Sequence, residues 1–152
     1  MTDPVAFEST SPRFSLPLLN TAQSQKEFFV NEALAITDSL LHCAIEGTAS
    51  APPSDPNEGT SWLVTSPASG QWIGQEGKIA ARQGGQWIFI TPRDGLQLLN
   101  RSNGQQMRFV SGWKAATLPP VPSGGATIDQ EARTALASLV ARLQIAGIFP
   151  TT

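Results

Sequence analysis

Apolar side chains recur every three or four positions along residues 21–46, which is the spacing of one face of an α-helix. Two neighbouring rows keep this spacing: Phe29, Ala33, Ile36, Leu40 and Ala44, and Val30, Leu34, Leu41 and Ile45. Asn20 and Gln23 have the spacing of an N-terminal cap, and Gly47 follows the last apolar position, where glycine commonly ends a helix. The pattern therefore predicts a long N-terminal helix over residues 21–46, about 39 Å long at the usual rise per residue.

The apolar face of this predicted helix is wider than the single stripe that a surface helix needs. A chain of 152 residues has little core of its own with which to cover so long a helix. We therefore interpret residues 16–47 as a helical oligomerisation segment. Its expected interface residues are Phe29, Ala33, Ile36 and Leu40.

Between residues 48 and 117 the pattern changes to short β-forming runs separated by turn signals. The predicted strands are 61–65, 70–73, 78–83, 86–91, 96–101, 105–110 and 113–117. Gly84-Gly85 and Asn103-Gly104 are typical of tight hairpins between such strands. Strands this short and this closely joined predict a small antiparallel β meander, barrel- or sandwich-like, as a β domain over residues 48–117.

The ends of the chain show three further segments. Residues 1–15 contain Pro4 and Pro12 and are predicted to form an extended arm, whereas residues 118–126 read as a proline- and glycine-rich linker. A C-terminal helix is predicted over residues 127–147, with Thr127 and Gln130 as a capping box and Gly147 as its stop. Its apolar stripe is Ala132, Leu136, Leu139 and Leu143.

A helix of about eighteen residues is only marginally stable in isolation, so we expect the C-terminal helix to pack against another part of the protein or another chain. We expect Leu136, Leu139 and Leu143 to contribute to an oligomer interface. Taken together, the segments predict an α+β fold with a long N-terminal helix, a small antiparallel β meander and a C-terminal helix.

Composition narrows the possible functions. Only 14% of residues are charged, against roughly 25% in a typical soluble domain, and the net charge is −2. This balance argues against a nucleic-acid-binding protein, and a hydrophobic content of 40% argues against charge-driven disorder. No apolar run reaches the roughly 18 residues of a membrane helix, and the first residues lack the pattern of a signal peptide. We therefore expect synthesis in the cytoplasm and no membrane insertion.

Few residues are candidates for catalysis or metal binding. His42 and Cys43 are the single histidine and the single cysteine, and both fall within the first predicted helix. The chain has no known metal-ligand, Walker or nucleophile-elbow motif, so we predict no catalytic residue, no metal and no cofactor. The acids of the β region lie in turn contexts: Asp55, Glu58, Glu76 and Asp94. A polysaccharide-depolymerising enzyme would need two of them to face each other across a cleft, and this remains a third functional hypothesis.

The four tryptophans all lie in the β region. Trp87 begins a continuous apolar run, which indicates a buried strand. Trp72 follows Gly70-Gln71 in a loop-like setting, where an exposed indole can stack on a sugar ring. Core packing is the other interpretation of a tryptophan in a small domain. A carbohydrate-binding module that uses Trp72, Gln71 and Trp113 is therefore the alternative function.

Motifs along nearly the whole chain resemble a prophage-associated family, the domain of unknown function 2793. The most specific ones are Leu16-Pro17-Leu18-Leu19, Ala22-Gln23-Ser24-Gln25-Lys26 and Asn31-Glu32-Ala33-Leu34. Thr21 departs from the pattern, because the family commonly has glycine or another small residue there. The resemblance continues through Gly70-Gln71-Trp72, Gly85-Gln86-Trp87, Pro92-Arg93-Asp94-Gly95 and Gly112-Trp113 and covers residues 14–147.

This resemblance implies a component of phages, prophages or gene transfer agents, such as a tail fibre, tail tip or head spike. It brings no catalytic residues. We therefore expect a non-enzymatic structural or adaptor subunit, assembled into a virion or phage-like particle as a homo-oligomer, most simply a trimer. Its expected partners are copies of itself, other structural proteins of the particle and, for host recognition, cell-surface polysaccharide.

Overall fold

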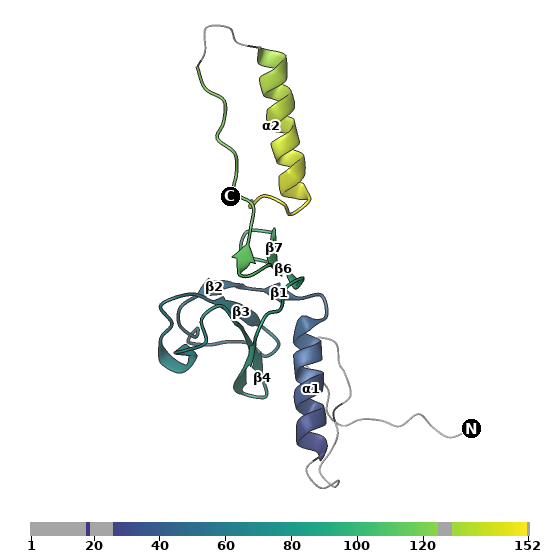
Figure 1. Ribbon diagram of the computed structural model, residues 1–152, viewed down its shortest axis with the longest axis vertical. Coiled ribbons are helices and arrows are strands. Elements are labelled where there is room, and N and C mark those ends of the chain that lie inside the picture. The colour runs from purple at the N-terminus through teal and green to yellow at the C-terminus, as the bar shows by residue number, and fades with distance from the viewer. Residues whose placement is uncertain (1–17, 19–25, 125–128, 152) are drawn as a thin grey trace, which may run out of the picture. The chain divides into compact units, whose positions relative to one another are not determined.

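The computed structural model of the chain describes residue 18, residues 26–124 and residues 129–151 (Figure 1). The predicted arm at residues 1–15 lies outside these residues. The chain divides into two compact units, Met1–Pro92 and Arg93–Thr152, and each is described by itself. Within the described residues, no helix combines the length and the hydrophobicity needed to cross a membrane.

The N-terminal helix is shorter than predicted. Helix α1 comprises Lys26–Leu40, and the predicted start at residues 21–25 lies outside the described residues. The prediction of a long helix over residues 21–46 is wrong because the backbone turns after Leu40, where His42 has a φ of +46°. The chain then enters two short strands, β1 (Ala44–Ile45) and β2 (Gly47–Ala49). Cys43 and Ile45 are buried at alternate positions, which is the periodicity of a strand.

The sheet of the first unit is mixed. Its strands are β2, β3 (Ser61–Val64), β4 (Ile79–Gln83) and β5 (Gln86–Ile90), in that order. Strands β2 and β3 are parallel, and the other neighbours are antiparallel. The predicted purely antiparallel meander is therefore wrong. The proline-rich segment between β2 and β3 is long enough to return the chain to the end of the sheet at which β2 begins, and a parallel pair requires this return.

The predicted strands at 61–65, 78–83 and 86–91 are confirmed with slightly shorter bounds. The predicted strand at 70–73 is wrong, because this segment forms a 3₁₀ turn, η1 (Gly70–Trp72). Gly70 has a φ of +61°, which a strand does not accommodate. The amide of Ser69 donates to the carbonyl of Ser50 over 2.8 Å, so η1 is held beside the segment that follows β2.

One face of this sheet carries the aromatic core of the unit. Val64, Trp72 and Ala80 are buried at its centre. Further apolar side chains pack against them: Ala49, Trp62, Ala68, Trp87 and Phe89. The register explains this grouping, because Trp62 pairs with Ala80, and Ala80 pairs with Phe89. Paired residues point to the same side of a sheet, so the aromatic residues accumulate on one face.

The second unit contains three antiparallel strands and a helix. Strands β6 (Gln97–Asn100), β7 (Gln105–Phe109) and β8 (Trp113–Lys114) pair side by side in that order. The predicted strands at 96–101 and 105–110 are confirmed with slightly shorter bounds, whereas the strand predicted at 113–117 is confirmed only over Trp113–Lys114. The predicted two-residue turn at Asn103-Gly104 is wrong, because Asn100 pairs with Gln105 and the turn comprises residues 101–104.

Helix α2 (Gln130–Ile145) begins at Asp129, whose carboxylate accepts a hydrogen bond from the amide of Ala132 over 2.9 Å. The predicted capping residue Thr127 lies outside the described residues. Gly147 ends the helix as predicted, with a φ of +71°. The segment before the helix is extended and runs beside it (Figure 1), and the Arg133 guanidinium donates to the carbonyls of Pro122 and Gly124.

The chain after α2 returns to the small sheet. The amide of Gln106 donates to the carbonyl of Gly147 over 2.6 Å, and the amide of Thr151 donates to the carbonyl of Asn103 over 2.8 Å. The buried side-chain amide of Gln105 donates to the carbonyls of both Ala116 and Ile148. Both ends of the segment that contains α2 are therefore fastened to β7.

Candidate functional site

The hairpin of β4 and β5 places an arginine over a tryptophan. Gly84-Gly85 forms the two-residue turn between Gln83 and Gln86, so the next pair along the hairpin is Arg82 with Trp87. The guanidinium carbon of Arg82 lies 5.4 Å from the centre of the Trp87 ring, which is the geometry of a cation–π contact. This pair lies on the face of the sheet that carries the aromatic core.

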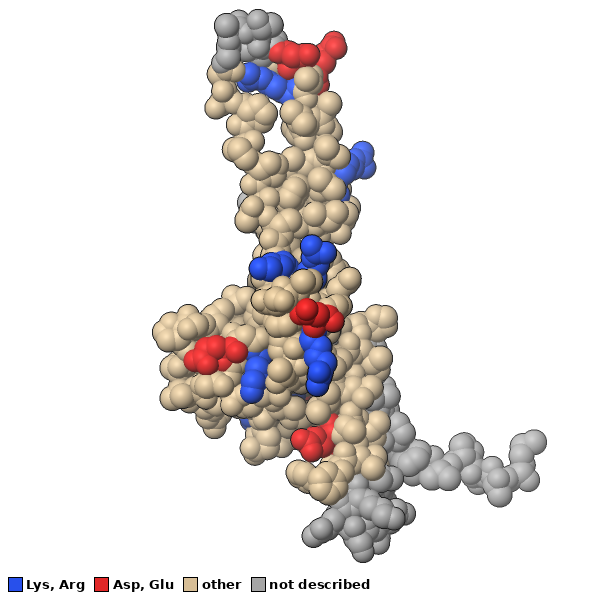
Figure 2. All heavy atoms as spheres, in the orientation of Figure 1, with Lys and Arg blue, Asp and Glu red and all other residues tan. Residues whose placement is uncertain are grey.

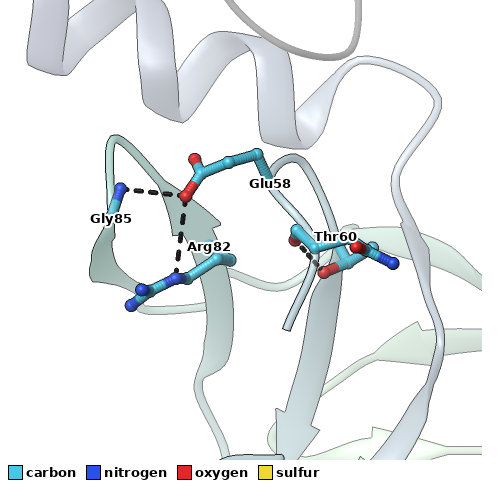
Figure 3. A network of polar contacts seen from close by, with 5 residues as sticks. Glu58, Thr60, Arg82 and Gly85 are labelled. Carbon is cyan, nitrogen blue, oxygen red and sulfur yellow. Dashed lines mark hydrogen bonds and ion pairs between the residues drawn. The ribbon is translucent and has the colours of Figure 1, made fainter. Parts of the chain in front are cut away.

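A carboxylate fixes this arrangement from the neighbouring loop (Figure 3). Glu58 Oε1 accepts a hydrogen bond from the amide of Gly85 over 2.9 Å and lies 3.7 Å from Arg82 Nε. Backbone hydrogen bonds from Gly59 to Arg82 and from Arg82 to Thr60 hold the loop against β4. Glu58 therefore connects the loop, the hairpin turn and the arginine at one point.

The Arg82–Trp87 pair opens onto a surface groove of about 620 Å³. Residues of β4 and β5 and of the turn between them, one residue of η1 and the loop after β2 form its walls. The lining residues are Pro52, Pro53, Ser54, Pro56, Gln71, Arg82, Gly85, Gln86, Trp87 and Phe89. Among the described residues of this lining, Arg82 is the sole charged one. The groove thus combines aromatic and proline surface with amide, hydroxyl and guanidinium groups.

Trp72 lies in the core rather than at the surface. Its side chain is 0% exposed, and its ring meets that of Trp87 edge-to-face with centres 5.1 Å apart. Its indole Nε1 has no hydrogen-bond partner among the described residues. A ring in this position presents no face to a sugar, so the core interpretation of Trp72 holds in this structure. Gln71, the residue before it, is exposed and lines the groove.

Trp113, the other residue proposed for sugar stacking, belongs to the second unit. It is half-buried and packs edge-to-face on Phe109, with ring centres 5.3 Å apart. Trp113 and Gln71 therefore belong to different units of the chain.

The residues proposed for an oligomer interface occupy two helices. On α1, Phe29 is 69% exposed, Ala33 is exposed, and Ile36 and Leu40 are half-buried. The buried positions of α1 lie on a different face and are small or polar: Ala35, Asp38 and Ser39. On α2, Leu136 and Leu139 are 49% and 54% exposed, and Leu143 is half-buried. No residue of α2 described here is buried.

The four acids of the β region have different surroundings. Glu76 Oε1 accepts a hydrogen bond from the amide of Ala68 over 3.1 Å, and Asp94 Oδ1 accepts one from Ser111 over 2.8 Å. The pKa of Glu76 lies below its ordinary value because its own amide and then that of Ala68 donate to the carboxylate. Asp55 is exposed, and Glu58 is held by Gly85 and Arg82.

None of these four acids lines the groove. Across the described residues, no three histidine, cysteine, aspartate or glutamate side chains gather in a group that would hold a metal ion. His42 is exposed in the turn after α1, and Cys43 is buried.

Sequence reasoning missed Arg82 and interpreted Trp87 as a core residue only. The signal was present, because a two-residue turn at Gly84-Gly85 fixes the pairing of residue 82 with residue 87. Prolines 52 and 53 give no comparable signal, since their position depends on the contact between Ser50 and Ser69.

Comparison with known proteins identifies a family without an assigned activity. The family model described as "Protein of unknown function (DUF2793)" matches residues 30–114, which is more than half of the chain. The chain belongs to this family. No curated protein and no solved structure matches it.

Proposed function

We propose that this protein is a non-enzymatic structural or adaptor subunit that associates with copies of itself in a phage-like particle. The observation that carries the self-association is the state of α2. This helix of 16 residues has a leucine stripe, yet none of its residues is buried. Isolated helices of about this length are marginal in water, and most helix stability in proteins comes from packing of an apolar face.

The surface of α2 fits such an interface. Figure 2 shows charged atoms near its N-terminal end and little charge along most of its visible length. The extended segment beside it leaves an apolar groove of about 460 Å³, lined by prolines and by α2 residues such as Leu136 and Val140. Leu139 lies outside that lining and is 54% exposed. A second copy would bury this face.

The test is the molar mass of the full chain, measured by light scattering after gel filtration. We expect an oligomer, and a monomer at micromolar concentration would refute self-association. Leu139→Glu should shift the mass toward the monomer. Ser138→Glu is the matched control, because it adds the same charge one position away on an exposed residue. Equal effects of the two substitutions would exclude the leucine face as the interface.

The assignment to a phage-like particle is supported by the motifs at residues 16–34 and by membership of the family. Its test is mass spectrometry of particles purified on a density gradient from an induced culture of the source strain. The chain should co-purify with capsid and tail proteins. Recovery in the soluble fraction alone would contradict the proposal.

A second candidate function is saccharide binding, which the groove of the first unit favours. Its lining combines aromatic rings with planar polar side chains, among them Trp87, Gln71 and Gln86. Sugar-binding sites use aromatic surface for the ring faces and a few placed polar groups for the hydroxyls. A glycan array with wild type and Gln86→Ala tests this function; binding that is absent, or unaffected by the substitution, would count against it.

A further inference from the structure

The Arg82 side chain has hydrogen-bonding capacity that its surroundings do not use. It is only 23% exposed, and its Nε is buried without a hydrogen-bond partner. The nearest carboxylate oxygen, Glu58 Oε1, is 3.7 Å from Nε, which is beyond hydrogen-bond distance. The side-chain contacts of Arg82 with described residues are therefore an ion pair at Nε and a ring contact, and neither occupies the fork formed by the two terminal nitrogens, Nη1 and Nη2.

The fork is also held in one place. The Trp87 ring supports the guanidinium from one side. Glu58 is itself fixed by the amide of Gly85 (Figure 3). A guanidinium that is already oriented loses less side-chain entropy when it binds a planar anion. Guanidinium groups bind carboxylates through two parallel hydrogen bonds, which makes them selective for planar acidic groups.

The charge of the groove agrees with an acidic ligand. Arg82 is the charged residue of its described lining, and Glu58 lies behind it outside the lining. A neutral sugar would offer the terminal nitrogens of Arg82 only hydroxyl oxygens, which form weaker hydrogen bonds with a guanidinium than a carboxylate does. A carboxylate on the sugar would pair with both terminal nitrogens at once.

We infer that the groove binds a saccharide that carries a carboxylate, with Arg82 as the carboxylate ligand. Gln71 and Gln86 then bind hydroxyl groups, and the exposed parts of Trp87 and Phe89 contact the sugar ring. This inference rests on the proposed saccharide-binding function and adds the class of sugar.

The experiment uses matched pairs of acidic and neutral probes. Calorimetry with the full chain compares trigalacturonate with its methyl ester, and a hyaluronan tetrasaccharide with its methyl ester. Esterification removes the charge and leaves the sugar rings intact. We expect the esters to bind at least tenfold more weakly. We also expect Arg82→Gln to weaken the acidic probes by a similar factor while leaving the esters within threefold.

Two controls separate binding from folding. Arg93→Gln removes an exposed arginine of the second unit and should leave both affinities unchanged. Arg82→Lys keeps the charge but loses the planar fork, so it should give an intermediate affinity. Circular dichroism of each variant confirms that it is folded. If Arg82→Gln does not fold, the ratio of acid to ester affinity in wild type decides the question.

The outcomes distinguish the two proposals. Equal binding of acids and esters would overturn the acidic class and leave saccharide binding standing. An acid preference that survives Arg82→Gln would overturn the role of Arg82. Absence of binding by every probe, together with a negative glycan array, would overturn both.

Discussion

Truncation of Trp72 should be the most damaging single substitution in the first unit. Its ring is fully buried and meets Trp87 and Trp62, with ring centres 5.1 and 6.5 Å away. Replacing a buried aromatic side chain by alanine costs about 3–5 kcal/mol. Each aromatic pair contributes about 0.5–1.5 kcal/mol beyond burial, which places Trp72→Ala toward the upper end, at about 4–5 kcal/mol. The free energy of unfolding of a small domain is only about 5–15 kcal/mol, so this variant should be close to unfolding.

The companion variant Trp72→Phe separates packing from hydrogen bonding. It keeps an aromatic ring and removes the indole N–H that has no partner among the described residues. An unpaired buried donor costs about 1–3 kcal/mol, and its removal offsets part of the free energy that is lost with the larger ring. We therefore expect a loss of less than about 2 kcal/mol, clearly smaller than for alanine.

Urea denaturation followed by far-UV circular dichroism measures both losses without depending on the fluorescence of the deleted ring. With a slope of about 2 kcal/mol per molar urea, Trp72→Ala should lower the midpoint by about 2–2.5 M. Trp113→Ala, which removes a half-buried ring of the second unit, is the matched control and should cost about 1–2 kcal/mol. A loss below about 1 kcal/mol for Trp72→Ala would refute its place in the core.

Two further predictions concern the backbone and pH. Hydrogen bonds from the amides of Glu76 itself and of Ala68 lower the pKa of the Glu76 carboxyl group. The ionised carboxylate therefore stabilises the fold at pH values above the ordinary carboxyl pKa. This stabilisation is lost as the pH falls through the lowered pKa. Glu76→Gln should therefore be less stable than wild type at neutral pH, and denaturation curves should converge in acid; a pH-independent gap would contradict this. Gly147→Ala should cost about 1 kcal/mol more than Gly84→Ala in thermal melts, because overpacking adds to the backbone penalty that the two positions share. Both glycines have positive φ, but only at Gly147 would a Cβ lie 3.2 Å from a carbonyl oxygen, that of Gly104. Equal melting temperatures would count against that contact.

Local signals predicted the hairpin of β4 and β5 well. Glycines in tandem at Gly84-Gly85 fixed both the turn and the register of the strands around it, because a two-residue turn leaves no freedom of pairing. The α+β class was also predictable. The stop at Gly147 was found for the same reason as the hairpin, since a left-handed residue after an apolar run is a local signal.

Long-range packing was not predictable from the same pattern. Residues 41–45 satisfy helical spacing as well as strand alternation, and only the turn at His42 decides between them. The parallel pairing of β2 with β3 depends on where the proline-rich segment returns, which no local signal encodes. Trp72 offered a loop-like sequence context, and its burial results from rings contributed by β3 and β5.

The candidate groove was only half predictable. Gln71 was identified from its sequence context, whereas no sequence pattern singled out Arg82, although both line the groove. Its role depends on Glu58, which lies 24 positions earlier and reaches it through the turn that precedes β3. Cooperation between residues so far apart emerges only from the fold.

The double hydrogen bond of Gln105 has a consequence for how this family can vary in length. Because one side chain holds both Ala116 and Ile148, the segment between them leaves the small sheet and returns at the same place. Loop length adds little entropic cost to such a closed segment. Insertions of whole helical turns into α2, with matching additions to the extended segment, would extend the reach of the protein by about 1.5 Å per helical residue while the sheet stays unchanged. The segment is in this sense an adjustable spacer, whose length evolution or design can set independently of the rest of the chain.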